Sequence, residues 1–307
     1  MDIGNMLTVS VIIPTHNRPE SVQASVKSVL NQSRPVDELI VVNDGSSDPY
    51  PDIEAFVSDY GSGEDDVPRF EYIENPTPQG AASARNTGAS VATGDIYMFL
   101  DDDDRWRKNK VHRQVEHFER RPNHGIVYSG RVATDESGNE LYSIGVGSGG
   151  NLSKSILERN EIGTTSTPAI DANLFDSVGG FDPEMPALQD WELWIRLCQD
   201  TLVGYDPAET VEWTIHDDGG QMTADHVPYA EAIHRIERKH ADLFKRLSRL
   251  ERRQACAFRE RIVASKRPET SPKRYTHLAW SLFYWPTPAT AAAFLPDVVV
   301  QRLRSYM

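Results

Sequence analysis

The stretch "FLDDDDRW", residues 99–106, places four aspartates directly after an apolar run that we expect to be buried. Neighbouring carboxylates repel one another, and partial burial strengthens the repulsion. In an extended segment, Asp101 and Asp103 would point to the same side, and their oxygens would suit a hard divalent cation such as Mg2+ or Mn2+. Two interpretations stay open: a metal site at the end of a strand, or a solvated acidic loop.

The elements that position these aspartates alternate in type along the first part of the chain. Apolar or alternating runs predict strands, and apolar residues at helical spacing predict helices between them. The predicted strands are 8–15, 37–48, 69–75 and 95–104, and the predicted helices are 18–32, 79–94 and 108–121. This order predicts an α/β fold with a mainly parallel, Rossmann-like sheet flanked by helices. Ligands bind at the carboxyl ends of such strands, where Asp44 and the aspartates would lie.

The pattern loosens after residue 125. A short strand is predicted at 125–130, and a loop or hairpin at 133–153. An amphipathic helix is predicted at 190–200. Trp191 and Trp194 are candidates for stacking on a sugar, but their helical spacing predicts that at least one of them is a core residue. A helical stretch is predicted from about 226 to 266, as a C-terminal extension.

Residues 278–296 carry no charge and are flanked by basic residues. Three prolines interrupt this segment, which argues against a simple membrane-spanning helix. Two alternatives stay open. The segment lies in the plane of a membrane or against a partner, or it packs on its own domain.

Composition limits the class of protein. The net charge of -14 argues against general nucleic-acid binding. Two cysteines, Cys198 and Cys256, are too few for a disulfide framework, and the N-terminus does not resemble a signal peptide. We therefore expect a cytoplasmic protein, with a peripheral position on the cytoplasmic face of the membrane as an alternative. Only eight of the 32 basic residues are lysine, which is typical of a halophile-like acidic surface or of an ordinary acidic enzyme.

Five motifs occur in a characteristic order: "VSVIIPTHNRP", "IVVNDGSSD", "GAASARNTG", "YMFLDDDDRW" and "LQDWELWIRL". Together they resemble the family 2 inverting glycosyltransferases with the GT-A fold, over roughly residues 8–216. The resemblance implies a GT-A domain over 1–220, with a nucleotide-sugar-binding half at 1–105 and an acceptor half at 106–220. A helical C-terminal extension at 221–307 would follow.

The resemblance also implies roles for individual residues. Some residues would contact the nucleotide base, namely Pro14, Thr15, His16 and Asp44. Arg85 would lie near the diphosphate, Asp101 and Asp102 near the ribose, and Asp103 would ligate the metal. Asp44 has a second interpretation as part of an Asx-type turn in "NDGSSD", and Arg85 as a helix-surface side chain.

Asp190 would be the catalytic base by the same resemblance, deprotonating the acceptor hydroxyl. It follows Gln189, where the family commonly has glutamate, and it is also a candidate N-cap of the 190–200 helix. His216 would lie near the metal or diphosphate, or be structural.

The implied activity is transfer of a sugar from a nucleotide diphosphate donor, most often a UDP-sugar, with Mn2+ or Mg2+ as cofactor. The acceptor would be a glycan, lipid-linked if the uncharged tail contacts a membrane, in surface-glycan or glycoprotein assembly. Two rivals stay open. A sugar-nucleotide nucleotidyltransferase typically has a glycine-rich loop after the first strand, and "PTHNRPES" has no glycine. The other rival is a binding module without catalysis.

Overall fold

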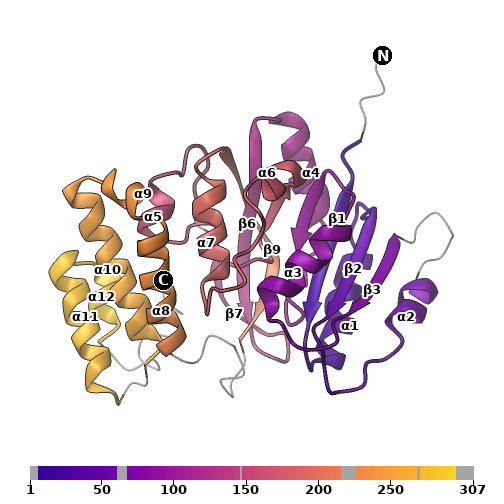
Figure 1. Cartoon of the computed structure of the whole chain (residues 1–307), viewed down its shortest axis with the longest axis horizontal. Helices are drawn as coiled ribbons and strands as arrows, with labels where there is room; N and C mark the ends of the chain where they lie inside the picture. The colour runs from indigo at the N-terminus through magenta and orange to yellow at the C-terminus, as the bar shows by residue number, and fades with distance from the viewer. Residues whose placement is uncertain (1–5, 61–67, 146, 216–225, 268–269, 295–307) are drawn as a thin grey trace. The chain divides into compact units, whose positions relative to one another are not determined.

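The computed structural model describes residues 6–60, 68–145, 147–215, 226–267 and 270–294 (Figure 1). These residues form two compact units, each built from separate parts of the chain. The first comprises Met1–Leu152, Ile162–Pro183 and Arg196–Thr214, and the second comprises Ser153–Glu161, Glu184–Ile195 and Ile215–Met307. The expected division near residue 220 stays a prediction.

The first unit is built on one sheet. Its strands are β1 Val9–Thr15, β2 Glu38–Asn43, β3 Arg69–Glu74, β4 Ile96–Phe99, β5 Arg105–Trp106, β6 His124–Thr134, β7 Glu140–Ile144, β8 Pro168–Asp171 and β9 Leu202–Thr214. They lie in the order β3-β2-β1-β4-β8-β6-β9-β5, with β7 paired to β6. Its helices are α1 Pro19–Leu30, α2 Ile53–Tyr60, α3 Ala81–Val91, α4 Lys110–Arg120 and α6 Ala172–Ser177.

The strands β1 to β4 form the parallel half of the sheet. β1 pairs in parallel with β2 and with β4, and β2 with β3, so that Ile12 lies opposite Ile40 and Phe99. Every residue of β1, β2 and β4 is buried, as expected for strands covered on both faces. β4 ends at Phe99, so the prediction that this strand continues through Asp104 is wrong.

Helices cover both faces of this parallel half (Figure 1). Val22, Val26 and Val29 of α1 join one core cluster with Val9 and Val11. α3 packs on the opposite face. A Cβ added to its Gly88 would lie 2.5 Å from a methyl carbon of Ile12 and 3.2 Å from one of Val42. Glycine is therefore required there for the close approach of the helix to the sheet.

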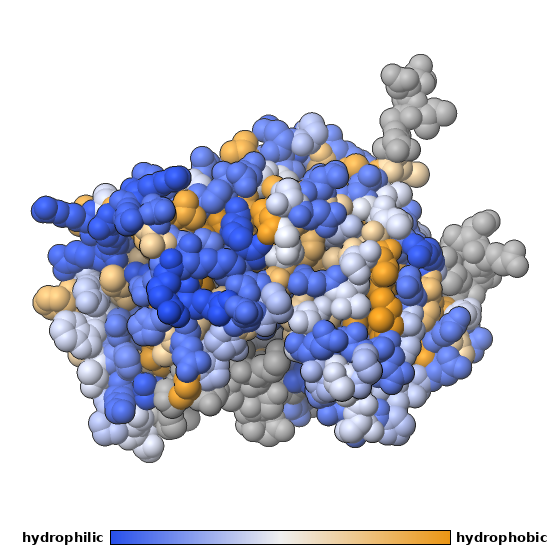
Figure 2. Space-filling view, viewed as in Figure 1, coloured by the Kyte–Doolittle hydropathy of each residue, from blue (hydrophilic) through white to orange (hydrophobic). Residues whose placement is uncertain are grey.

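The second half of the sheet is mixed. β8 lies antiparallel between β4 and β6, whereas β6 and β9 run parallel. β6 is longer than the predicted strand, and β7 forms with it the hairpin that was one alternative for residues 133–153. The strand β9 and the helix α2 were not predicted. Figure 2 shows that hydrophilic residues dominate the face it presents, in keeping with the net charge of -14.

The second unit is helical. It contains α5 Ser155–Glu158, α8 His226–Lys239, α9 Ala241–Lys245, α10 Arg249–Ser265, α11 Pro272–Tyr284 and α12 Pro288–Ala292, while α7 Gln189–Leu197 has residues in both units. The helical stretch predicted over 226–266 is thus three helices. Ser248 begins α10 with a capping box, since its hydroxyl accepts from the Glu251 amide and the Glu251 carboxylate accepts from the Ser248 amide.

The uncharged segment predicted at 278–296 lies partly outside the described residues. Its described part contains the end of α11, which stops before Pro286, and α12. Leu278 and Ser281 are buried within the helical unit, whereas Trp280 and Phe283 are exposed. Among the residues that the structure describes, no helix combines the length and apolar character needed to cross a membrane.

Candidate functional site

The carboxyl ends of β1, β2 and β4 are neighbours in the sheet. In the sheet, β1 lies between β2 and β4. The chain continues from β1 to β2 and β3 on one side, and β4 begins the other side, so the boundary between β1 and β4 is a topological switch point. Thr15 is the last residue of β1, Asp44 directly follows β2, and Asp101 comes two residues after the end of β4. The predicted convergence of Asp44 and the aspartates at one edge of the sheet is confirmed by this strand order.

The four aspartates form a turn. The amide of Asp104 donates to the carbonyl oxygen of Asp101 at 3.0 Å. The hydroxyl of Ser25, on α1, lies 2.8 Å from the carbonyl oxygens of both Asp102 and Asp104. The prediction of an extended segment with alternating side chains is therefore wrong, because the turn and Ser25 satisfy backbone groups that an extended strand would leave to a partner.

Two arginines supply positive charge to this aspartate turn. Nη1 of Arg18 lies 3.0 Å from a carboxylate oxygen of Asp102 and 2.5 Å from one of Asp103. Arg85, on α3, donates to Asp101, which also accepts from the hydroxyl of Thr165 at 2.8 Å. The guanidinium of Arg85 also lies over the ring of Phe181, 5.4 Å from its centroid.

The carboxylates of the aspartate turn differ in burial and in pKa. Asp102 is buried, and burial raises its pKa to about 6 despite the opposing charge of Arg18. Asp104 is buried more deeply, and burial, with the charges of Asp103 and Asp101, raises its pKa well above the usual value. The side chains of Asp101 and Asp103 keep 28% and 17% of their area exposed, so these two carboxylates face solvent.

The carboxylate of Asp104 is bound by hydrogen-bond donors of two other segments. Its carboxylate accepts from the hydroxyl of Ser166 at 2.6 Å and from the amide of Thr214 at 3.3 Å. It thereby ties the aspartate turn to the segment before β8 and to the end of β9. Trp106 is buried and donates its indole N–H to the carbonyl of Ser166 at 3.0 Å.

The end of β1 contacts the aspartate turn directly. The hydroxyl of Thr15 donates to Asp102 at 2.7 Å and lies 2.8 Å from the hydroxyl of Tyr50. Pro14 is buried within β1, whereas His16 is exposed and its Nδ1 lies 2.8 Å from the carbonyl oxygen of Asp44. Thr15 thus lies at the aspartate turn, while His16 lies beside Asp44.

Asp44 is buried at the start of α3. Its carboxylate accepts from the amide of Gly80 at 2.7 Å, from the amide of Gln79 at 3.0 Å and from the side chain of Asn75 at 2.7 Å. The Asx-type turn is made by its neighbour Asn43, whose side-chain oxygen accepts from the amide of Ser46. A contact of Asp44 with a nucleotide base stays a prediction.

Several residues at this edge were missed by sequence reasoning. Asn17 has a left-handed backbone with φ 53°, and its side-chain oxygen accepts from the amide of Ser47 at 2.8 Å. This contact fastens the loop after β1 to the loop after β2. Arg18, Tyr50 and Thr165 were also missed. Arg18 belongs to the quoted motif "VSVIIPTHNRP". Its positive charge, in a motif whose end was expected to lie near the four carboxylates, was the signal that could have identified it.

Asp190 belongs to the second unit. It lies in the first turn of α7, which begins at Gln189, so Asp190 is not the N-cap. Its carboxylate accepts from the side-chain amide of Asn160 at 3.1 Å. Leu188, two residues earlier, has φ 56°, a strained conformation for a bulky residue. The catalytic role of Asp190 stays a prediction.

Trp191 and Trp194 of α7 are fully buried. The indole N–H of Trp191 donates to the carbonyl of Ile156 at 2.6 Å. The sequence left open that either ring stacks on a sugar, and both rings are instead core residues. His216 lies outside the described residues, and within the described ones no group of three or more His, Cys, Asp or Glu is placed to hold a metal ion.

Residues 10–175, more than half of the chain, match the family described as Glycosyl transferase family 2. The chain belongs to glycosyl transferase family 2. The match begins one residue into β1, includes β2 to β4 and the aspartate turn, and ends before Asp190. The family predicted from the five ordered motifs is thus confirmed.

Two curated relatives differ in how much of their length this chain covers. An uncharacterized glycosyltransferase of Rickettsia conorii is 30% identical over 224 residues, which are 69% of this chain and 35% of the relative. This chain thus spans about a third of that relative. A putative colanic acid biosynthesis glycosyl transferase of Escherichia coli is 27% identical over 78% of this chain and 84% of its own length.

Two solved structures share the fold. A mannosyltransferase of Pyrobaculum calidifontis, in complex with GDP-Man and Mn2+, has a TM-score of 0.60 at 17% identity, over 99% of this chain and 85% of that one. Residues 1–349 of TarS from S. aureus, in complex with UDP-GlcNAc, have a TM-score of 0.60 at 16% identity, over 97% and 88%. These likenesses confirm a GT-A type fold for this family 2 chain.

Proposed function

We propose that this family 2 glycosyltransferase is metal-dependent and inverting, and that it transfers a sugar from a nucleotide diphosphate donor to an acceptor hydroxyl of a glycan. The observation that carries the proposal is the aspartate turn at the β1–β4 switch point, with two part-exposed carboxylates. The bound ligands of the two structural neighbours, GDP-Man and UDP-GlcNAc, support a nucleotide-sugar donor. A UDP-sugar is the first donor to test.

The aspartate turn fits a divalent cation in its donor chemistry. Asp101 and Asp103 offer carboxylate oxygens at the solvent-facing side of the turn. Mg2+ and related ions are often held by one or two carboxylates together with substrate phosphates and water, so a full protein cage is not required. When bound, such an ion supplies charge stabilisation for the departing nucleotide diphosphate. In this proposal Asp103 and Asp101 hold the ion, with His216 as a further candidate ligand.

The remaining residues at this edge would orient the donor. Arg85, fixed by Asp101 and by the ring of Phe181, presents a cation next to the diphosphate site. Pro14, Thr15, His16 and Asp44 line the ends of β1 and β2, where the base is proposed to bind, and Asp102 lies with Thr15 near the proposed ribose position.

Asp190 is the proposed catalytic base. It takes the proton from the acceptor hydroxyl as that oxygen attacks the anomeric carbon and the bond to the diphosphate breaks. A single displacement of this kind inverts the anomeric centre and needs no covalent intermediate. Glycan assembly as the setting is supported by the printed name of the Escherichia coli relative.

The first prediction concerns donor binding. Calorimetric titration with UDP should show binding that requires Mn2+ or Mg2+ in the native chain and in Asp59→Asn, an exposed aspartate on α2. Asp103→Asn should lose the metal-dependent part of the UDP affinity, because one of the two proposed metal ligands loses its charge. GDP and dTDP follow if UDP does not bind. Failure of all three nucleotides with both metals would overturn the proposal.

Catalysis is tested with Asp190→Asn, with the exposed Asp200→Asn as matched control. Transfer should fall about 10²- to 10⁴-fold, as expected for loss of a general base, while nucleotide affinity stays unchanged. NMR of the product reports whether the anomeric centre is inverted. Unchanged transfer in Asp190→Asn would reject this base and favour another residue, and a chain that binds the donor without any turnover would favour the binding-module alternative.

A further inference from the structure

The charges of this chain are distributed unevenly. The whole chain has a net charge of -14, yet residues 241–294 carry eleven lysines and arginines and only four aspartates and glutamates. This segment contains α9, α10, α11 and α12 of the helical unit. A basic segment on a strongly acidic protein indicates a local surface for an anionic partner.

The helices α10 and α11 form an antiparallel pair within this unit. The hydroxyl of Ser281 donates to the carbonyl of Ala257 at 2.7 Å. The guanidinium of Arg253, near the start of α10, donates to the carbonyl oxygens of Phe283 and Tyr284 at 3.0 and 2.9 Å. The beginning of α10 therefore lies beside the end of α11.

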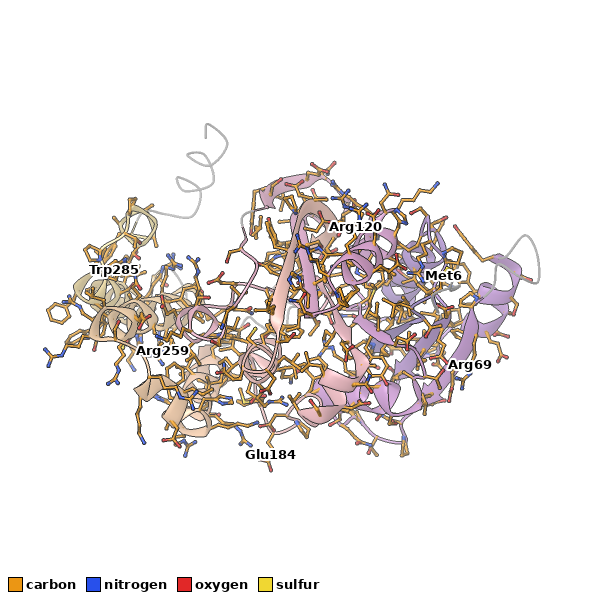
Figure 3. The ribbon with its side chains drawn as sticks, turned by 90° about the horizontal axis from the view of Figure 1, so that it is seen from above. Met6, Arg69, Arg120, Glu184, Arg259 and Trp285 are labelled. Atoms are coloured by element: carbon orange, nitrogen blue, oxygen red, sulfur yellow. The ribbon has the colours of Figure 1, made fainter. Side chains whose placement is uncertain are left out.

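The outer face of α11 carries exposed aromatic rings at this end. Trp280 and Phe283 are 48% and 67% exposed, while Leu278 and Ser281, on the face toward α10, are buried. The ring of Tyr284 lies 6.0 Å from that of Trp280 and 5.7 Å from that of Phe283, measured between centroids. Figure 3 labels Trp285, the residue that directly follows this helix.

Leu250, 62% exposed at the start of α10, belongs to the same end of the helix pair. We call Leu250, Trp280, Phe283 and Tyr284 the aromatic end. An exposed apolar cluster of this kind marks a surface for interaction, because burial of such groups against a partner is favourable.

Basic side chains occupy the same end. Exposed lysines and arginines here are Lys245, Arg246, Arg249, Arg252 and Arg253. Arg252 donates to the carbonyl of Lys245, which places the end of α9 next to the start of α10. Among the acidic residues at this end, Glu251 is used in the capping box and Asp242 pairs with Lys245. Glu158 of α5 also lies near Glu251, whose charge contributes to the raised pKa of Glu158.

We propose that the aromatic end and its basic residues form a docking surface for a membrane with anionic headgroups. Trp, Tyr and Phe rings are favourable in the interfacial layer, and arginine and lysine are attracted to an anionic bilayer surface. α11 has 13 residues, fewer than the roughly 20 that span a bilayer, so the contact is made at the surface. The exposed rings of Trp280 and Phe283 lie on one face of α11, as in a helix that lies in the plane of a membrane surface.

The test is co-sedimentation of the full chain with vesicles, without donor or acceptor. Binding to phosphatidylcholine vesicles containing phosphatidylglycerol is expected, together with weaker binding to pure phosphatidylcholine and loss of binding at high salt. Trp280→Ala with Phe283→Ala should weaken binding at least tenfold, and so should Arg246→Glu with Arg249→Glu. Far-UV circular dichroism confirms folding, and all four side chains are exposed.

Matched controls are Leu141→Ala and Arg120→Glu, exposed residues of the first unit, which should bind vesicles as the native chain does. No binding, or binding that the double variants leave unchanged, would overturn the proposal. Competition by a single-stranded oligonucleotide at the same surface would overturn it in favour of nucleic acid. Loss of a dimer on gel filtration in the aromatic variant, without vesicle binding, would assign the surface to a second copy. None of these readouts depends on the proposed transferase activity.

Discussion

Two arginines, Arg18 and Arg85, contact three of the four neighbouring aspartates of the turn. Arg18 bridges Asp102 and Asp103, and Arg85 contacts Asp101. Asp104 is stabilised by neutral donors, Ser166 and the Thr214 amide. Because Asp103 is proposed to ligate a cation, Arg18 lies where it would be repelled by that cation, and binding of the ion implies a rearrangement of this guanidinium.

Lys110 is a fully buried lysine in the core of the first unit. Its amino group donates to the side-chain oxygen of Gln114 and lies 4.4 Å from the centre of the Trp106 ring. Burial lowers the pKa of Lys110 well below its usual value, with Asp206 opposing the shift. The ring face favours the charged form, but complete burial is the larger effect.

Stability should therefore depend on pH through Lys110. The pKa of this lysine is about 10.4 in the unfolded chain and lower in the folded protein. Between the two values the unfolded chain binds a proton that the folded protein does not, so the free energy of unfolding rises with pH. Lys110→Met should lower the slope of the free energy of unfolding against pH by about 1.4 kcal/mol per pH unit.

Urea unfolding between pH 8 and 9.5 measures this slope. Lys108→Met changes an exposed lysine two residues earlier and should keep the native slope. Equal slopes in native protein and Lys110→Met would mean that Lys110 is protonated in the folded state throughout this range.

At the scale of elements, α3 depends on a carboxylate from another element. Its N-cap is Gly80, with φ 91° and no capping side chain. Asp44, at the end of β2, accepts instead from the amides of Gln79 and Gly80 and complements the positive end of the helix. The helix that carries Arg85 is thus anchored to the strand that ends at the proposed base site.

Asp44→Ala should destabilise the first unit by about 1–3 kcal/mol, because it leaves the buried side-chain amide of Asn75 and the part-buried amides at the start of α3 without their acceptor. Thermal unfolding measures the change, with the exposed Asp48→Ala as control. Unchanged stability, combined with lost UDP affinity, would instead assign Asp44 to the nucleotide alone.

For the whole molecule, the net charge of -14 predicts a stabilising effect of salt. Raising KCl from 0.1 to 1 M shortens the Debye length from about 10 to about 3 Å and screens the repulsion between acidic groups. The free energy of unfolding, measured with urea, should therefore rise with KCl. Vesicle binding should weaken over the same increase in KCl. A stability that falls with KCl would contradict the interpretation of the acidic surface as self-repelling.

The sequence by itself determined the family, the parallel strands β1 to β4 and the edge at which Asp44 and Asp101–Asp104 lie. These features follow from local causes: continuous apolar runs, helical spacing and motif order. β9 was not predicted, because its buried and exposed residues follow no simple alternation. The segment 278–296 contains no charged residue, so the sequence does not show which of its residues are buried. In the structure, one face of α11 is buried and the other is exposed.

Only the tertiary structure decided how the aspartates are used. The turn, the contacts of Arg18 and the burial of Asp104 depend on groups 60 to 110 positions away along the chain, such as Ser166 and Thr214. Pairing at such separation leaves no local pattern, because the partners meet only when the strands assemble. For the same reason Trp191 and Trp194 carry the composition of a sugar-binding surface and are nevertheless core residues.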